Sequence, residues 1–446
     1  MYPNRVKFND MNVLELSEQE IIRRNSMNEL RAMGIEPYPA AEYVTNAFST
    51  DIKAEFKDDD EPRQVSIAGR MMSRRVMGKA SFIELQDSKG RIQVYITRDD
   101  ICPDENKDMY NTVFKRLLDL GDFIGIEGFV FRTQMGEISV HAKKLTVLAK
   151  SLKPLPIVKY KDGVAYDSFE DPELRYRQRY VDLIVNDGVK ETFLKRTKVI
   201  STMRAVLDEA GYTEVETPIL QSIPGGASAR PFITHHNSLD IDLYLRIATE
   251  LYLKRLIVGG FEGVYEIGKN FRNEGMDKNH NPEFTCMELY VQYKDYNWMM
   301  SFTEKLLERI CITVNGCTET QIDGKTISFK APYRRLPILE AIKEKTGYDL
   351  EGKSEDEIRQ ICRELKMEID DTMGKGKLID EIFGEFCEGT FIQPTFITDY
   401  PVEMSPLTKM HRSKPGLTER FELMVNGKEL ANAYSELNDP IDQEER

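Results

Sequence analysis

Apolar and polar residues alternate along several short segments between residues 63 and 150. They are VSIAGRMM, ASFIELQD and RIQVYI, then, after a helix-like stretch at 109–118, FIGIEGFVF, EISVHA and KKLTVLA. A period of two places successive side chains on opposite faces of a strand. Three strands, a helix and two or three further strands predict a five-stranded Greek-key barrel of the OB type, a fold that commonly binds oligonucleotides. A generic small barrel that holds a protein partner is the alternative.

The pattern changes on both sides of this segment. Residues 1–62 are polar, with a helix expected near Glu18–Met33, and form an N-terminal helical extension. Residues 151–171 carry prolines, a glycine and no periodicity, which predicts a linker. The barrel itself is expected to occupy residues 63–150.

Beyond the linker, helix-like and strand-like segments alternate irregularly from residue 172 to residue 446. Helices are expected at 172–185 and 190–210, and Val425-Asn426-Gly427-Lys428 is a hairpin signal. The fold class expected here is therefore α+β, around an antiparallel sheet. A mostly helical insertion, at about 316–393, is expected to pack outside that sheet.

The charge distribution bears on the partner of the barrel. The chain has 61 Lys and Arg against 75 Asp and Glu, a formal net charge of −14, which argues against non-specific coating of nucleic acid. From Arg63 to Arg98, however, eight basic residues stand against two acidic ones, and Phe82 lies among them. This local basic excess favours a nucleic acid over a protein partner.

Cysteine spacing and hydropathy exclude other classes. The six cysteines form no Cys-x-x-Cys pair, and no histidine stands near one at metal-ligand spacing, so reduced thiols are expected. No apolar run approaches the ~20 residues that span a bilayer, and the N-terminus has no signal-peptide order. A cytoplasmic protein with no membrane segment is expected.

The segment from Phe271 to Tyr293, FRNEGMDKNHNPEFTCMELYVQY, holds the clearest candidate site. An arginine at a strand end, a polar loop and an alternating return strand predict a hairpin whose tip closes over a phosphate-bearing ligand. The return strand has an apolar face (Thr285, Met287, Leu289 and Val291) and a mixed face (Phe284, Cys286, Glu288, Tyr290 and Gln292). A sheet with one solvated face would explain Glu288, but a pocket explains the combination better.

Here the chain resembles a known family. FRNEG, HNPEF and MELY are similar to motif 2 of class II aminoacyl-tRNA synthetases. Further segments resemble the bacterial-type lysyl-tRNA synthetase family in particular, namely LRYRQRYVDL, EVETPIL, PGGASARPF, LYLRIATELYLKRL and GKELANAYSELNDP. The resemblance implies a two-step reaction, in which lysine and ATP form lysyl-adenylate and the lysyl group is then esterified to tRNA(Lys).

The resemblance implies an ATP site on the hairpin. Arg272 would grip the α-phosphate and neutralise charge that grows in the transition state. Phe284 would stack on adenine, and Glu274, His280 and Asn281 in the loop would contact the base and phosphates. Without the motif, a lone histidine such as His280 is more often structural.

Carboxylates are assigned to the remaining substrates. Glu422 and Glu429 flank the Asn-Gly turn on paired strands and are expected to share Mg²⁺ bridging ATP phosphates, unless one of them merely pairs with Lys428 or Arg420. The expected lysine site combines acidic, polar and backbone groups: Gly226, Glu250, Glu288, Tyr290, Asn432 and Glu436. Since Asn432 and Glu436 share strand parity and Glu429 does not, a bulge or twist is required if all three line one site.

For the barrel, the resemblance implies recognition of the anticodon. Phe82 would stack on a central uracil, with Arg70 and Gln93 reading its edge. EVETP, with Pro218, corresponds to motif 1, which builds the dimer interface in this class, so a homodimer is expected by analogy.

One feature departs from the family pattern. No glycine-rich motif 3 with its ATP-holding arginine precedes the end of the sequence at Arg446. A fragment of a longer protein is expected, because the break leaves a sheet edge uncovered. The alternative is a catalytically impaired tRNA-binding or regulatory homologue. A ligase that lysylates a protein is also conceivable, but such an enzyme has no anticodon to read.

Overall fold

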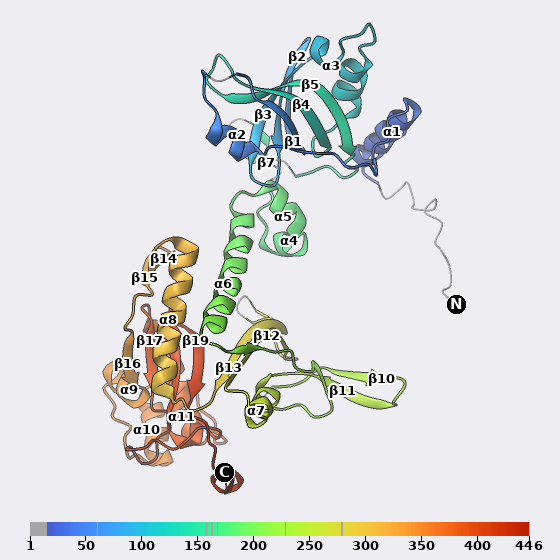
Figure 1. Cartoon of the computed structure of the whole chain (residues 1–446). Coiled ribbons are helices and arrows are strands. Elements are labelled where there is room, and N and C mark those ends of the chain that lie inside the picture. The colour runs from blue at the N-terminus through green and yellow to red at the C-terminus, as the bar shows by residue number, and fades with distance from the viewer. Residues whose placement is uncertain are drawn as a thin grey trace. The chain divides into compact units, whose positions relative to one another are not determined.

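The computed structural model describes residues 16–59, 61–156, 159–161, 164–166, 168–227, 229–277 and 280–445. Residues 1–15 of the expected N-terminal extension lie outside this set, as do positions 157–158, 162–163 and 167 of the expected linker. The contacts divide the chain into two compact units, Met1–Val189 and Lys190–Arg446, which are drawn in Figure 1 and are described separately below.

The first unit is built on a closed five-stranded barrel with the strand order β1-β2-β3-β5-β4. Its strands are β1 (Gln64–Met77), β2 (Ala80–Gln86), β3 (Arg91–Thr97), β4 (Phe123–Arg132) and β5 (Ile138–Ala149). β3 and β5 pair in parallel and the other neighbours are antiparallel. Closure leaves no free sheet edge, and the strict alternation of buried and half-buried residues in β2 and β3 is the pattern that the sequence predicts.

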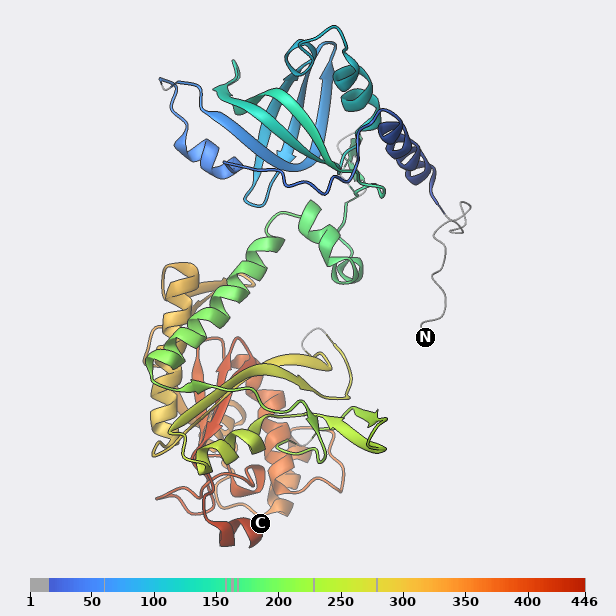
Figure 2. The same ribbon diagram turned by 45° about the vertical axis from the view of Figure 1, so that its right-hand side comes forward.

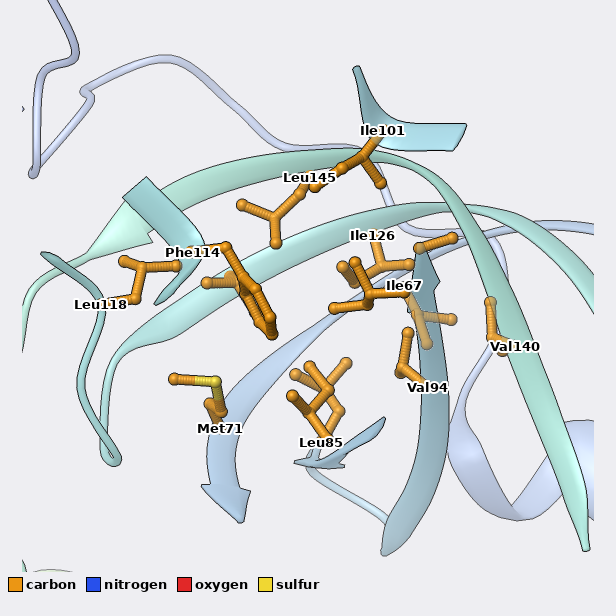
Figure 3. Packing of buried hydrophobic residues seen from close by; sticks show 14 of the residues in the cluster. Ile67, Met71, Leu85, Val94, Ile101, Phe114, Leu118, Ile126, Val140 and Leu145 are labelled. Carbon is orange, nitrogen blue, oxygen red and sulfur yellow. The ribbon is translucent and has the colours of Figure 1, made fainter. Parts of the chain in front are cut away.

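The inside of the barrel is apolar, as Figure 3 shows for Ile67, Val94 and Ile126. A π-helix (Met109–Leu117) lies at the position of the predicted helix and contributes the buried ring of Phe114. α1 (Glu18–Ala32) adds Leu30 to the same core. Each of these buried apolar side chains contributes roughly 1.5–3 kcal/mol.

The first unit contains several shorter elements around the barrel. α1 begins at a capping box formed by Ser17 and Glu20, at the position predicted for the N-terminal helix. The remaining elements are α2 (Ser49–Glu55), α3 (Arg98–Ile101), β6 (Lys159–Lys161), β7 (Val164–Tyr166), α4 (Pro172–Arg177) and α5 (Arg179–Val185). The antiparallel pair β6–β7 falls within the expected linker, so that segment is not free of regular structure.

The second unit contains four small sheets in the described residues. Their strand orders are β13-β12-β8, β10-β11-β9, β16-β17-β18-β19 and β14-β15. The strands are β8 (Thr213–Glu214), β9 (Leu220–Gln221), β10 (Ile233–His236), β11 (Ile241–Leu245), β12 (Gly263–Phe271), β13 (Glu283–Val291), β14 (Glu319–Ile322), β15 (Lys325–Ser328), β16 (Arg334–Pro337), β17 (Thr395–Thr398), β18 (Arg420–Val425) and β19 (Lys428–Tyr434). Most pairs are antiparallel, as expected, but β8–β12 and β16–β17 are parallel.

Helices cover both faces of the four-stranded sheet (Figures 1 and 2). On one face, Phe421 and Leu423 pack with Tyr296 and Met300 of α8. On the other, Met424 packs with residues of α9, α10 and α11. The helices of this unit are α6 (Val189–Glu209), α7 (Glu250–Val258), α8 (Tyr296–Asn315), α9 (Ile338–Thr346), α10 (Glu355–Glu364), α11 (Lys375–Phe386) and α12 (Pro440–Glu445). Such a layered α+β arrangement buries both faces of the sheet.

The segment 316–393 is less helical than expected. Its first part forms β14, β15 and β16, and β16 joins the four-stranded sheet beside β17 instead of packing outside it. The helical part begins at Ile338. The turn predicted between Val425 and Lys428 is confirmed, since Asn426 and Gly427 both have positive φ, at 50° and 69°.

Candidate active site

Strands β12 and β13 form the hairpin that the sequence predicts, paired from Gly263–Val291 to Phe271–Glu283. Arg272 follows β12 directly, and its backbone N–H donates to the carbonyl oxygen of Pro282 (2.9 Å). Its guanidinium carbon lies 5.2 Å from the centre of the Phe284 ring. The two residues assigned to the α-phosphate and to adenine are therefore neighbours on the hairpin.

The other proposed ATP contacts lie on the exposed loop of this hairpin. His280 Nδ1 lies 2.8 Å from Asp277 Oδ2, and Asn281 Nδ2 donates to the backbone carbonyl of Glu283 (2.8 Å). Glu274 is also exposed. His280 and Asn281 thus bind within this loop, and no contact in the described part of the chain joins their side chains to the Arg272 guanidinium or the Phe284 ring. Lys278 and Asn279, also in this loop, lie outside the described residues.

Glu288 lies on the predicted mixed face of β13. Its Oε2 accepts from the Tyr290 hydroxyl (3.2 Å), and its Oε1 accepts from the backbone N–H of Thr249 (3.3 Å). Burial, together with the Glu288 and Glu250 carboxylates, raises the pKa of Tyr290 well above its ordinary value, so its hydroxyl stays a donor. The opposite face of β13 is only half-buried, and there Thr285 is exposed and accepts from Arg196 (3.2 Å).

Helix α7 brings a second carboxylate into the same region. Glu250, at its first turn, is 7% exposed and accepts from the Tyr434 hydroxyl (3.3 Å). One turn later Lys254 donates to Glu250 Oε1 (2.5 Å) and lies 2.8 Å from Glu436 Oε1. Glu250 and Glu436, 186 positions apart in the sequence, are thus bridged by one ammonium group. Lys254 and Tyr434 are members of this site that sequence reasoning missed.

Gly226 lies against the same group of side chains. It has φ of +89°, which a glycine adopts without strain, and a Cβ atom added there would lie 3.1 Å from Ala248 Cβ and 3.2 Å from Glu250 Cβ. Any side chain would therefore crowd Glu250. The structure brings Gly226 and Glu250 together, as the lysine-site assignment requires.

The bulge that the assignment demanded is present in β19. Leu423 pairs with Ala431 and Met424 with Glu429, so Leu430 is left without a partner in the ladder. The extra residue reverses the parity of β19, and Glu429 comes to the same face as Asn432 and Glu436. Asn432 is exposed and donates to Glu422 Oε1 (3.3 Å).

The two proposed magnesium ligands differ in their surroundings. Glu422 accepts from Arg420 Nη2 (2.5 Å), which is the ion pair considered as its alternative role. Glu429 is exposed as a residue, but desolvation of its carboxylate by neighbouring protein atoms and the nearby Glu422 carboxylate raise its pKa. Glu388 is a third carboxylate in this region, and burial together with Glu422 raises its pKa as well.

The residues present fit a magnesium ion shared with phosphates. The described part of the chain has no group of three or more His, Cys, Asp or Glu side chains that could hold a metal alone. Magnesium in phosphoryl-transfer sites usually takes only one or two carboxylates and completes its shell with phosphates and water. Glu422 and Glu429 supply that number of oxygen-bearing side chains.

A buried ion pair packs against the β12–β13 hairpin. Arg246 is 2% exposed, and its Nη1 donates to Glu266 Oε1 (2.5 Å) and to the backbone carbonyl of Thr217 (3.1 Å). Its own backbone carbonyl accepts from the N–H of Phe271, the last residue of β12. The pair therefore ties the EVETP segment to the strand that carries Arg272. Neither Arg246 nor Glu266 was singled out in the sequence.

On the barrel, Phe82 belongs to a larger group of rings. The Tyr95 ring lies 4.9 Å from Phe82 and 5.1 Å from the His141 ring. Phe129 and Phe131 lie 4.8 and 5.6 Å from His141. These five residues, termed the ring platform below, come from β2, β3, β4 and β5 and alternate with core residues. The alternating phenylalanines of FIGIEGFVF were the signal that could have revealed it.

The two other proposed anticodon residues are placed differently. Gln93 shares the face of Phe82 and donates to Ser139 Oγ (2.9 Å). Arg70 instead lies over the Phe123 ring (4.2 Å) and donates to the backbone carbonyl of Gly121 (2.7 Å). Arg75 is the cation over Phe82, at 5.6 Å. Arg70 and Phe82 are thus not neighbours in this structure.

One surface hollow in the second unit, of about 490 Å³, lies apart from all these residues. Lys330, Tyr333 and Arg334 are among its lining residues. Its polar side chains bind within the wall: Arg334 pairs with Glu344 (2.7 Å) and Gln393 donates to Thr326 O (2.8 Å). It contains none of the proposed site residues.

Comparison with known families agrees with this geometry. Residues 171–446 match the family described as tRNA synthetases class II (D, K and N), and residues 65–148 match the OB-fold nucleic acid binding domain. The chain therefore belongs to the class II tRNA synthetase family, with an N-terminal OB-fold domain. The predicted α+β fold class and the family resemblance seen in the sequence are confirmed.

Close relatives are named lysine–tRNA ligases. The protein of Porphyromonas gingivalis strain W83 is 69% identical over 438 residues, which cover 98% of this chain and 76% of the relative. That of Azobacteroides pseudotrichonymphae is 65% identical over 97% of this chain and 86% of the relative. That of Christiangramia forsetii is 64% identical over 97% and 76%. Among the described residues, no helix is long and apolar enough to cross a membrane.

Proposed function

We propose that this chain is an ATP-dependent lysine–tRNA ligase, which forms lysyl-adenylate and transfers the lysyl group to tRNA(Lys). The observation that carries the proposal is the meeting of Glu250, Glu288 and Glu436 on elements far apart in the sequence. The matching family includes aspartate, lysine and asparagine enzymes, as the letters in its description indicate. Among those three amino acids, only the lysine side chain carries an ammonium that carboxylates can compensate.

In this proposal the two ammonium groups of lysine contact the acidic side chains. Glu250, beside Gly226, is suited to the α-ammonium, and Gly226 allows the substrate to approach the backbone closely. Glu288 and Glu436, with the Tyr290 hydroxyl and Asn432, are suited to the side-chain ammonium. A partly dry pocket strengthens each of these charge pairs relative to water.

The carboxylate of lysine attacks the α-phosphorus of ATP, and pyrophosphate leaves. Arg272 is the catalytic residue, because a guanidinium at the α-phosphate neutralises charge that develops in the transition state. Phe284 offers the stacking face for adenine. Glu274, His280 and Asn281 are assigned to the base and phosphates, which requires the exposed loop to close over the nucleotide.

Magnesium would be held between Glu422, Glu429 and the ATP phosphates. When bound, it supplies electrostatic stabilisation to the departing pyrophosphate. Glu429 is the better-prepared ligand, since Glu422 is already paired with Arg420.

The barrel is proposed to read the anticodon. Phe82, within the ring platform, would stack on a central uracil, with Gln93 beside it and Arg75 in the position first assigned to Arg70. A homodimer and a cytoplasmic location complete the proposal. Four exposed apolar side chains on α4 and α5 support an interface between copies: Leu174, Tyr176, Tyr180 and Leu183.

Amino-acid-dependent ATP–pyrophosphate exchange tests this function. Exchange is expected with lysine and not with aspartate or asparagine. Subsequent transfer should occur to tRNA(Lys) and not to tRNA(Asp). Exchange with aspartate or asparagine at a comparable rate, or lysine-independent binding of tRNA without any exchange, would contradict the proposal.

A further inference from the structure

Lys254 occupies an unusual place among the acidic residues. Its ammonium lies 2.5 Å from Glu250 Oε1 and 2.8 Å from Glu436 Oε1, and its side chain is 25% exposed. It also lies 5.9 Å from the centre of the Tyr434 ring. An i,i+4 Glu–Lys pair is common on helices, but here the lysine also binds a carboxylate from beyond β19.

The net charge of the proposed lysine site complements that of lysine. The amino-acid pocket is defined here by Glu250, Glu288, Glu436, Lys254 and Arg272, which gives three negative and two positive charges. Its net charge is therefore −1. Lysine, with two ammonium groups and one carboxylate, carries a net charge of +1 at neutral pH, so the occupied pocket is neutral.

We propose that Lys254 is a built-in counter-cation of the amino-acid pocket, which holds Glu250 and Glu436 together and matches the pocket charge to an amino acid of net charge +1. Lys254 is a positioning and specificity residue, since it acts through the two carboxylates and not on the reacting atoms. The inference rests on the proposed lysine specificity and concerns how that specificity is set.

The consequence is selection against ligands with more positive charge. Cadaverine is lysine without its carboxylate, so it has the same carbon chain and two ammonium groups but a net charge of +2. In the parent protein its charge of +2 exceeds the pocket charge of −1. If Lys254 is made neutral, the pocket charge becomes −2 and cadaverine becomes the better-matched ligand.

Calorimetric titration of lysine and cadaverine on the whole chain tests this. The quantity to compare is the ratio of the two dissociation constants, cadaverine over lysine. In Lys254→Met and Lys254→Gln this ratio is expected to fall about tenfold, the change that one partly screened charge produces. Lys254→Gln keeps a hydrogen-bond donor, so it separates charge from hydrogen bonding. Lys254→Arg should retain the parent ratio.

If the role of Lys254 were merely structural, its replacement would weaken the binding of both ligands equally and leave the ratio of their dissociation constants unchanged. An unchanged ratio in Lys254→Gln, with a melting temperature close to that of the parent, would therefore overturn the inference. Lys269→Met, which removes an exposed pair with Glu283 in the same unit, is the control and should change nothing. Failure of the parent chain to bind lysine would instead contradict the proposed function, so the two failures are distinguishable.

Discussion

Five rings meet on the strands of the barrel in the first unit, whereas three carboxylates meet at the hairpin and helix α7 of the second. The rings, from Phe82 to His141, contact one another and need no charge partner on the ligand. The carboxylates Glu250 and Glu436 are instead held by the ammonium of Lys254. The difference reflects two ways to bind a ligand. The rings of the barrel are suited to stacking on flat bases, and the carboxylates of the second unit are suited to pairing with the ammonium groups of a small cation.

The two surfaces also differ in what supports them. The ring platform rests on an apolar barrel, where strand alternation alone puts a side chain inside or outside. The acidic pocket rests on the buried Arg246–Glu266 pair and on a bulge at Leu430. A charge lost from the second unit is therefore more damaging than a ring lost from the first.

The largest expected effect follows from removal of Glu266. Glu266→Ala leaves the guanidinium of Arg246 buried without its carboxylate, which should lower the free energy of unfolding by about 3–5 kcal/mol. Urea denaturation of the parent and the variant measures this. Glu283→Ala removes an exposed carboxylate from the neighbouring strand and should cost little. An equally small effect of both variants would contradict the supporting role of the buried pair.

The second-largest effect is expected for Arg272→Ala. Loss of the guanidinium at the α-phosphate is expected to slow adenylate formation by at least ~100-fold, about 3 kcal/mol, with an unchanged melting temperature. Pyrophosphate exchange with lysine gives the rate. Arg309→Ala, which removes an exposed arginine of α8 paired with Glu209, is a matched control. Exchange within threefold of the parent rate would remove Arg272 from the catalytic role.

A ring of the platform should matter less. Phe82→Leu keeps apolar volume but loses the stacking face, so binding of an anticodon stem-loop with central uracils should weaken by roughly 1–3 kcal/mol. Phe82→Tyr keeps the ring and should retain the affinity. Filter binding measures both. If Phe82→Leu bound as well as the parent, or if central adenines bound equally well, the barrel would not read the anticodon through this residue.

The smallest predicted effect concerns pH. Burial raises the pKa of Glu436 above its ordinary value, so this carboxylate takes up its proton at a higher pH than an exposed glutamate does. Because an ammonium ligand needs the charged form, lysine affinity should fall as the pH is lowered below neutrality, and this fall should begin at a higher pH than an exposed glutamate would produce. Calorimetry at several pH values measures it, and Glu436→Gln should have weaker affinity with less dependence on pH.

The sequence predicted those features that depend on local pattern. Alternation gave the mixed face of β13, so Glu288 and Tyr290 lie together as expected. The parity of Asn432 and Glu429 even required the bulge that β19 contains. The Asn-Gly turn and the barrel strands follow the same local rules.

Long-range contacts could not be predicted in this way. Lys254 and Glu250 form an ordinary i,i+4 pair in the sequence, and nothing local indicates that Glu436 joins them. Arg70 was expected beside Phe82, but its strand partner is Gln86, four residues from Phe82 on β2, and its guanidinium lies over the Phe123 ring. His280 and Asn281 bind Asp277 and the carbonyl of Glu283 within the same loop. The sequence alone does not indicate these hydrogen-bond partners.

If the second unit recognises lysine through carboxylate charge, as proposed, the decisive experiment is calorimetric titration of lysine on Glu288→Gln. Glu288→Gln replaces one carboxylate by an amide of the same shape, so lysine affinity should fall by at least ~30-fold, about 2 kcal/mol, while ATP affinity stays within a few-fold of the parent value. Glu283→Gln, five positions earlier on the same strand, should bind both ligands as the parent does. Loss of ATP affinity with lysine affinity retained would contradict the claim.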